Sequence, residues 1–222
     1  AENRELAEYF RAAPGREIRK EQEYSDSSGR LFRMDRVIID PGADADEIAA
    51  AVKENGVKVR CVLNTHGHFD HVGADAAMKA AFGAPVAIHP DDAPLMADAH
   101  EHGIFFGVET PKQAAPDILL EDGQSMEFGP LKFKVIHTPG HTRGGVCLYL
   151  EGAKALFTGD TLFAGSVGRT DFEGGSMDEL MSSISRKLLS LDDKVMVLPG
   201  HGPSSTIGEE RMTNPYLAGI KR

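Results

Sequence analysis

The 222-residue chain has no tryptophan, only two cysteines and no long uninterrupted run of apolar residues. So few cysteines exclude a small fold held together by disulfides, and Cys61 and Cys147 each lie in an apolar strand-like run, where a free thiol behaves as a small buried apolar group. The longest apolar stretches, such as 195–198, are far shorter than the roughly 20 residues of a membrane span. Residues 1–30 carry charges where a signal peptide would need an apolar stretch. We therefore expect a cytoplasmic protein that makes no membrane contact.

Positive charge is also in deficit. The 24 Lys and Arg residues face 34 Asp and Glu residues, which leaves a formal net charge of −10 without any long basic run. Proteins bind nucleic acids through clustered positive charge that neutralises phosphates. The composition therefore predicts no nucleic-acid partner.

The pattern along the chain predicts one domain. Residues 1–30 form an atypical N-terminal segment, in which Leu6 and Phe10 suit a short helix and residues 16–29 an exposed loop or hairpin. Residues 31–222 contain no linker, repeat or low-complexity tract, so we treat them as a single domain.

Strand and helix patterns alternate in the first half of this domain and change in the second. Apolar runs predict strands at 31–39, 57–63 and 86–88, and helical spacing predicts helices at 44–53, 74–82 and 91–97. From residue 118, short strands separated by tight turns follow at 118–120, 124–128, 131–136, 146–150 and 155–157. A helix at 177–189, capped by Ser176, and a strand at 195–198 complete the series. The pattern indicates an α/β fold with two packed sheets, the second largely antiparallel, and helices outside.

Three histidines and one aspartate crowd the segment that follows the predicted strand 57–63. His66, His68, Asp70 and His71 lie within six positions, and Gly67 allows the short loop to turn several of them toward one point. Imidazole nitrogens with one or two carboxylate oxygens suit zinc and similar divalent ions. A polar loop with solvent-facing histidines would explain one or two of these residues but not the set. The cluster therefore predicts a metal site.

Three later polar residues follow Gly at the ends of apolar strands. They are His141, Asp160 and His201, each preceded by a run that predicts a strand. Each one alone is weak evidence, because Gly-His and Gly-Asp are common in turns. Together with the first cluster they give five histidines and two aspartates, which is enough for two metal ions about 3.5–4 Å apart that share a carboxylate and a water.

The ordered string His66-x-His68-x-Asp70-His71, then His141, Asp160 and His201, resembles the metallo-β-lactamase fold superfamily. Within it, the chain is most similar to compact bacterial glyoxalase II-like hydrolases. The stretches 39–42 (IDPG), 159–163 (GDTLF), 168–172 (GRTDF) and 214–216 (NPY) add to the likeness. The resemblance implies an αββα sandwich, in which two mixed sheets pack face to face with helices outside.

The resemblance also implies how the metal ligands divide. A first ion would be held by His66, His68 and His141, and a second by Asp70, His71 and His201, with Asp160 bridging the two. Zinc is the first choice for both, and the same nitrogen and oxygen ligands also accept iron or manganese.

The activity implied by the resemblance is hydrolysis of a small thioester of the S-lactoylglutathione type. A hydroxide bridging the two ions would be the nucleophile, because divalent ions lower the pKa of bound water toward neutrality. A thiol with a pKa of about 8.5 leaves readily as thiolate. Asp70 is the candidate catalytic residue, which would orient that water or carry its proton, and a role as metal ligand alone is the alternative.

The same resemblance assigns substrate binding to the loop that follows the bridging aspartate. Larger glyoxalase II enzymes place a basic and an aromatic residue there against glutathione. Arg169 matches the basic residue, and Phe172 lies where a tyrosine is expected. A surface salt bridge from Arg169 to Asp171 or Glu173 is the alternative for its guanidinium.

Other functions remain open at this point. A mononuclear iron persulfide dioxygenase would share the string and use His66, His141 and Asp160. Those relatives carry Asp-Tyr after the last histidine, whereas Gly202-Pro203 follows His201 here, which favours hydrolysis. A β-lactamase-like hydrolase is a third reading. A metal-binding domain without activity comes last, because every ligand position is filled.

The remaining histidines and a phenylalanine pair have less defined roles. His89, His100, His102 and His137 are expected to be packing, supporting or surface residues. Phe105 and Phe106, in a stretch read as a long loop, would form either an apolar wall or flap over the metals or a small separate apolar cluster.

Overall fold

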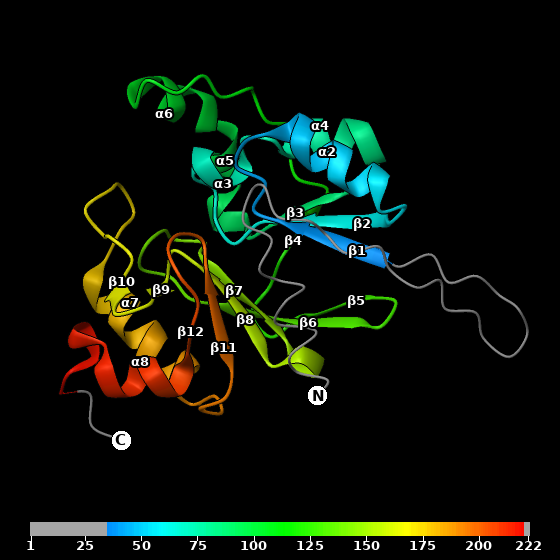
Figure 1. Cartoon of the computed structure of the whole chain (residues 1–222). Coiled ribbons are helices and arrows are strands. Elements are labelled where there is room, and N and C mark those ends of the chain that lie inside the picture. The colour runs from blue at the N-terminus through cyan, green and yellow to red at the C-terminus, as the bar shows by residue number, and fades with distance from the viewer. Residues whose placement is uncertain (1–34, 220–222) are drawn as a thin grey trace, which may run out of the picture.

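The computed structural model describes residues 35–219, which form four layers in the order helices, sheet, sheet, helices (Figure 1). The helix predicted near Leu6 and Phe10 and the loop predicted at 16–29 lie outside the described residues. The αββα arrangement expected from the sequence is confirmed.

The first sheet arises from the alternating half of the chain. Its strands β1 (Asp35–Ile39), β2 (Lys58–Leu63), β3 (Val86–Ile88) and β4 (Ile118–Leu119) lie in that order and are parallel throughout. The intervening helices are α2 (Ala45–Glu54), α3 (Phe69–Val72), α4 (Asp75–Phe82), α5 (Ala93–Ala97) and α6 (Ala99–Phe105), with a short 3₁₀ turn at Pro90–Asp92. Parallel neighbours require crossover connections, and these helices provide them on one face of the sheet.

The second sheet is the mixed one. Its order is β12-β11-β8-β7-β6-β5, in which β8 and β11 are parallel and the other neighbours antiparallel. The strands are β5 (Ser125–Phe128), β6 (Leu131–His137), β7 (Val146–Leu150), β8 (Ala155–Gly159), β11 (Met196–Pro199) and β12 (Ser205–Thr206). A two-stranded ribbon of β9 (Leu162–Phe163) and β10 (Ser166–Val167) follows β8. Helix α7 (Met177–Ser183), its π-helical continuation Ile184–Leu188, α8 (Ile207–Thr213) and a 3₁₀ turn at Pro215–Leu217 cover the outer face.

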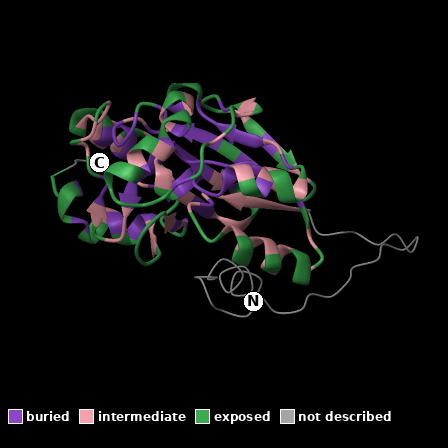
Figure 2. Cartoon of the chain, turned by 90° about the horizontal axis from the view of Figure 1, so that it is seen from above, coloured by how far each residue is buried: buried purple, intermediate pink, exposed green. Residues whose placement is uncertain are grey.

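Alternating side chains on the strands join the layers. On β2, Cys61 and Leu63 point into the core between the two sheets, while Val62 points into the core beneath the first helical layer. On β7, Leu148 faces the first sheet and Cys147 faces α7 and α8. The buried residues accordingly follow the strands, and the exposed ones lie mainly on helices and loops (Figure 2).

The stretch around Phe105, which the sequence analysis predicts to be a long loop, is helix α6 in the structure. The glycine that disfavours a helix there, Gly103, lies against the segment that returns from it. A Cβ at Gly103 would collide with the hydroxyl of Thr110. Close packing therefore explains a helical glycine that propensity alone reads as a break.

The topology brings the polar strand ends to one place. Strands β6, β8 and β11 run in the same direction, so their carboxyl ends lie at the same edge of the second sheet. His141, Asp160 and His201 follow these three ends. The end of β2 delivers His66 from the first sheet, which packs against the second. Four segments distant in sequence therefore converge.

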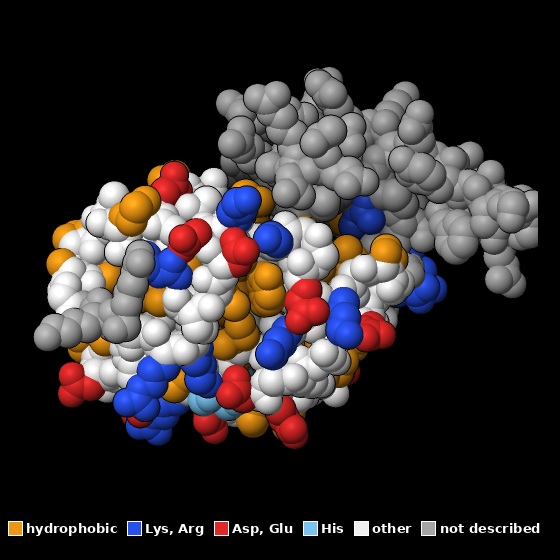
Figure 3. Space-filling model, turned by 90° about the horizontal axis from the view of Figure 1, so that it is seen from below, with side chains coloured by type: hydrophobic (Ala, Val, Ile, Leu, Met, Phe, Trp, Pro, Cys, Tyr) orange, Lys and Arg blue, Asp and Glu red, His pale blue; other side chains and the backbone are white. Residues whose placement is uncertain are grey.

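The outside of the molecule is mixed in charge. Positive and negative side chains are interspersed over the face seen in Figure 3. Within residues 35–219, no helix has both the length and the apolar character that crossing a bilayer requires.

Replacement of Gly140 by alanine tests the close packing between the loop after β6 and helix α7. Gly140 has φ 137°, and a Cβ there would collide with the backbone of Leu180 in α7. We expect Gly140→Ala to lower the free energy of unfolding by about 2 kcal/mol or more. Urea denaturation followed by circular dichroism measures this. Gly152→Ala is the matched control, since within residues 35–219 no atom beyond its chain neighbours lies within 4 Å of its added Cβ. Equal stability of the two variants would contradict the packing account.

Candidate metal centre

The turn after β1 organises the histidine loop. Asp40 accepts hydrogen bonds from the backbone N–H of Thr65 (2.7 Å) and from the Thr65 hydroxyl (2.6 Å). The same carboxylate accepts from Nδ1 of His71 at 3.1 Å. Sequence reasoning noted Asp40 only as part of a family stretch, because spacing in sequence does not show that it reaches the loop after the next strand.

Three imidazoles form the first ligand group. Suitable ligand atoms of His66, His68 and His141 all lie within 4.8 Å of one another. The three rings meet nearly at right angles, with interplanar angles of 79° to 88°. Nε2 of His141 lies 3.0 Å from Nδ1 of His68. The arrangement points three nitrogens toward a common centre, as a divalent cation requires.

A second group lies beside the first. Suitable ligand atoms of Asp70, His71 and His201 also lie within 4.8 Å of one another. Nε2 of His201 lies 3.3 Å from Nε2 of His71 and 3.1 Å from Oδ2 of Asp70.

Asp160 lies between the two groups. Its Oδ1 is 3.4 Å from Nε2 of His71, and its Oδ2 is 3.7 Å from Nε2 of His141 and 3.8 Å from Nε2 of His201. One carboxylate therefore reaches both groups, which is the placement that the resemblance predicts for a bridging ligand. All seven sequence-predicted ligands come together.

The nitrogens that face the centre are those left free by the surrounding protein. Nδ1 of His141 donates to the carbonyl of Arg169 at 2.7 Å, and Nδ1 of His71 contacts Asp40. Nδ1 of His66 lies 3.1 Å from the Thr65 hydroxyl, and its buried Nε2 has no hydrogen-bond partner among the described residues. A buried nitrogen without a partner is costly unless something else binds it. The site therefore fits a metal ion.

Protonation also favours metal binding on the His66 side. Burial, together with the neighbouring imidazoles, lowers the pKa of His66 well below its usual value. Burial and His141 lower the pKa of His68 to about 4. Burial opposes the charged form of His71 too, but its hydrogen bonds to Asp160 and Asp40 outweigh that effect and raise its pKa to about 10. At neutral pH His66 and His68 are thus uncharged and have their lone pairs available.

Asp92 joins the two loops that carry the first group. This buried carboxylate accepts from the backbone N–H of Gly67 at 3.0 Å, between His66 and His68. It also accepts from the Thr142 hydroxyl (2.7 Å) and the Gly144 N–H (2.6 Å), beyond His141. Sequence reasoning missed this residue, whose only local signal is its place in the turn that follows His89-Pro90.

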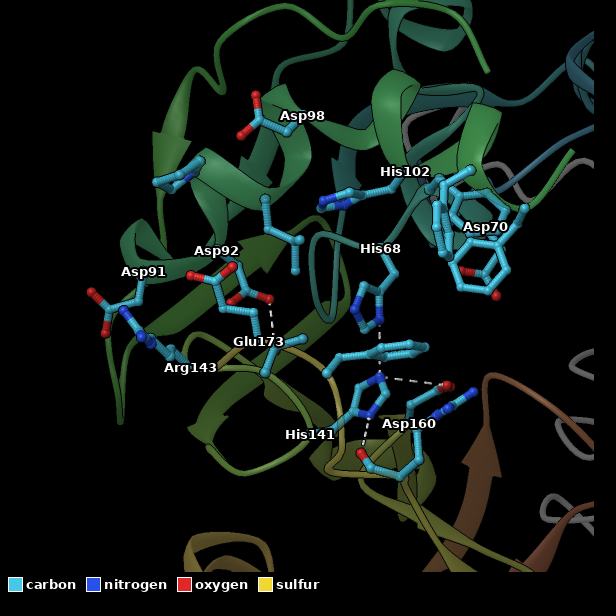
Figure 4. A pocket seen from close by; sticks show the side chains of 18 of the residues that line it. His68, Asp70, Asp91, Asp92, Asp98, His102, His141, Arg143, Asp160 and Glu173 are labelled. Carbon is cyan, nitrogen blue, oxygen red and sulfur yellow. Dashed lines mark hydrogen bonds and ion pairs between the residues drawn. The ribbon is translucent and has the colours of Figure 1, made fainter. Parts of the chain in front are cut away.

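A pocket of about 660 Å³ opens beside the centre. Figure 4 shows His68, His141 and Asp160 turned toward one another, with Asp91, Arg143 and Glu173 on one side and Asp70 on the other. Sequence reasoning did not single out Arg143, whereas both predicted substrate-binding residues, Arg169 and Phe172, line the pocket.

Arg169 makes the alternative contact named above as well. Its Nε and Nη2 each donate to Asp171 at 2.7 Å, and its guanidinium lies 4.0 Å from the centre of the Phe172 ring. The salt bridge and the position at the pocket therefore coexist.

The other histidines stay outside the centre. The rings of His89 and His137 stack in parallel, 4.1 Å apart at 7°. Lone pairs lie in the plane of an imidazole, so two parallel rings do not direct nitrogens at one ion, although Asp91 lies nearby. His102 lines the pocket, and on α6 the Nε2 atom of His100 lies 3.8 Å from Oε1 of Glu101.

Asp92→Asn tests whether this buried carboxylate positions the first ligand group. Asp92 accepts hydrogen bonds from three donors with its two oxygens. An amide has only one acceptor oxygen, so its NH₂ group must face at least one of these donors. We expect a loss of metal affinity of about 10- to 100-fold, measured by chelator competition. The neighbouring exposed Asp91, changed to Asn, is the control. Unchanged affinity in Asp92→Asn would show that the two loops hold their positions without this carboxylate.

Comparisons with known proteins agree with this geometry. The sequence model described as "Metallo-beta-lactamase superfamily" matches residues 33–201. The hydroxyacylglutathione hydrolase GloC of Haemophilus influenzae is 37% identical over 81% of this chain and 86% of its own, and the probable metallo-hydrolase YqgX of Bacillus subtilis is 37% identical over 83% and 88%.

Solved structures extend the likeness to three dimensions. BLEG-1 B3 metallo-beta-lactamase superposes with a TM-score of 0.79 at 38% identity, covering 83% of this chain and 90% of that one. TTHA1623 in a di-iron-bound form gives 0.76 at 42% identity, covering 81% and 88%. ETHE1 from Myxococcus xanthus gives 0.70 at 30% identity, covering 83% and 75%. With its fold, its ligand groups and its sequence in agreement, the chain belongs to the metallo-beta-lactamase superfamily.

Proposed function

We propose that the protein is a binuclear metal-dependent hydrolase of small thioesters of the hydroxyacylglutathione type. The observation that carries this proposal is the position of Asp160 within 4 Å of ligand atoms in both groups. The relative named hydroxyacylglutathione hydrolase, which aligns with 81% of the chain, supports the choice of thioester.

The proposed ligand sets are those of the sequence analysis. His66, His68 and His141 hold one ion, Asp70, His71 and His201 hold the other, and Asp160 belongs to both. When bound, a pair of divalent ions supplies hydroxide at neutral pH, because it lowers the pKa of water from about 15.7 toward ~7. We favour zinc, and iron is the alternative because TTHA1623 is described in a di-iron-bound form.

Asp70 is the proposed proton carrier. Its carboxylate lines the pocket and is 42% exposed, while one oxygen lies 3.1 Å from Nε2 of His201. The second oxygen can therefore accept a proton from an attacking water and release it toward solvent. The thiolate leaves without a dedicated acid, because a thiol pKa near 8.5 makes it a good leaving group.

Arg169 and Phe172 are proposed to bind the thiol portion of the substrate. The guanidinium is more than half exposed and already forms paired hydrogen bonds with a carboxylate, that of Asp171. A substrate carboxylate would exchange for Asp171 in the same geometry. We assign the reaction to the cytoplasm, since both cysteines are buried free thiols.

Metal content and a substrate panel test this function. Protein purified without added metal is expected to contain two ions per chain and to hydrolyse S-lactoylglutathione. One iron per chain, with oxygen uptake on glutathione persulfide, would show that the protein is a persulfide dioxygenase and not a hydrolase. Turnover of β-lactams in place of thioesters would replace it with the β-lactamase reading.

Asp160→Asn is the sharpest variant for the two-ion site. It keeps the shape of the side chain but removes the charge shared by the two groups, so we expect hydrolysis to fall at least about 100-fold and both ions to be retained less well. Asp192→Asn, at an exposed carboxylate paired with Lys154, is the control. Full turnover in Asp160→Asn would rule out the bridging role.

Arg169→Met tests substrate binding. We expect KM for S-lactoylglutathione to rise about twofold to fivefold with little change in kcat, because an exposed ion pair contributes up to roughly 1 kcal/mol. Arg186→Met, at an exposed position after α7, is the control. An unchanged KM would restrict Arg169 to its salt bridge with Asp171.

A further inference from the structure

A continuous row of aromatic rings leads from the metal centre to solvent. It consists of Phe172, Phe106, Phe69 and Phe105, called here the aromatic row. Phe172 meets the ring of His68 edge-on at 5.6 Å and the ring of Phe106 at 6.0 Å. Phe106 stacks on Phe69 at 5.5 Å and 24°, and Phe105 meets Phe106 edge-on at 5.2 Å. All four side chains line the pocket.

The outer rings of this row are uncovered. Phe105 is 84% exposed and Phe106 is 49% exposed. Removing apolar surface from water is favourable by roughly 25 cal/mol per Å², and contiguous exposed apolar surface at a pocket is typical of a binding site. Because these rings line the same pocket as His68 and Asp160, a molecule bound for hydrolysis would lie beside them.

The helix that carries the outer rings is firmly seated. Ala99 at its start is fully buried, and Gly103 packs against Thr110. The backbone N–H of Val108 donates to the carbonyl of Gly103 at 2.8 Å, which closes the turn after the helix. These contacts hold the helix against the segment that follows it, and the aromatic row forms one wall of the pocket.

The pocket is polar across from this wall. Asp91, Asp98, Arg143 and Glu173 all line it. Phe69 immediately precedes Asp70 in α3, and Figure 4 places Asp70 across the pocket from Asp91 and Arg143. Charged parts of a substrate are therefore better accommodated near Arg143, and an apolar part near Phe106.

We propose that the three outer rings of the aromatic row, those of Phe106, Phe69 and Phe105, are the acyl subsite and that they select thioesters with an aryl or branched apolar acyl group. This inference rests on the proposed thioesterase function and specifies its substrate class. An aryl group beside Phe106 can stack or meet the rings edge-on, a contact that a small lactoyl group makes only weakly. The polar thiol portion then lies at the inner end of the row, beside Phe172 and Arg169.

Two thioesters that share one thiol test the subsite. S-mandeloylglutathione and S-lactoylglutathione differ by a phenyl group in place of a methyl group, so their kcat/KM ratio, divided by the ratio of their uncatalysed hydrolysis rates, reports the acyl subsite. We expect the intact protein to favour the mandeloyl ester by about 5- to 30-fold. Phe106→Ala and Phe105→Ala are expected to remove most of this preference, because they lower kcat/KM for the mandeloyl ester several-fold more than for the lactoyl ester.

Ile104→Ala is the matched control. Ile104 belongs to the same helix and is 68% exposed, but it does not line the pocket. Its variant is expected to keep the full mandeloyl preference. Phe106→Leu retains apolar volume without a ring and separates loss of an aromatic contact from loss of folding, with circular dichroism and thermal unfolding recorded for every variant.

Each contrary result overturns the assignment in a recognisable way. Equal efficiency of the intact protein on both esters would overturn the acyl subsite and leave the proposed function standing. Equal losses on both esters in folded Phe106→Ala would assign Phe106 a positioning role instead. If Phe105→Ala abolished self-association in sedimentation and left the preference unchanged, the row would be a contact between copies of the chain. Failure to hydrolyse either ester would overturn both proposals.

Discussion

The carboxylate of Asp160 lies between two sets of imidazoles whose lone pairs face one another. Nitrogens in such proximity repel unless a positive charge lies among them, and burial prevents water from screening the repulsion. In the described structure, part of that charge is the proton of His71, whose pKa Asp160 and Asp40 raise. Two cations would perform the same task for all the ligands, so the packing around the centre and its chemistry depend on the same electrostatic requirement.

Two further carboxylates keep the ligands in place from outside. Asp40 fixes the loop at Thr65 and the ring of His71, whereas Asp92 connects the backbone beside His68 to the loop that carries His141. Both act on segments that ordinary propensity would leave as flexible turns. The histidines are therefore oriented before any ligand binds, which reduces the entropic cost of assembling the site.

The pocket has two chemically different sides, and this difference follows from how its walls are built. The aromatic side comes from α3 and α6, which belong to the first helical layer, together with the loop after β10 that carries Phe172. The polar side, across the pocket from Asp70, comes from the turn after β3 and from the segment around Arg143. A site between two sheets can thus keep its metal ligands on strand ends while the surrounding loops and short helices determine the substrate.

The sequence by itself determined the α/β layering, nearly all the strands and the set of seven ligand candidates, because apolar periodicity and dense histidine clusters are local signals. It also determined the superfamily, through the order and spacing of those ligands. Only the tertiary structure decided that α6 is a helix, because Gly103 is explained by a contact with Thr110 seven positions later. The roles of Asp40 and Asp92 and the row of four aromatic rings were likewise decided there, because each joins residues from segments that only the packing of the two sheets and their helices brings together.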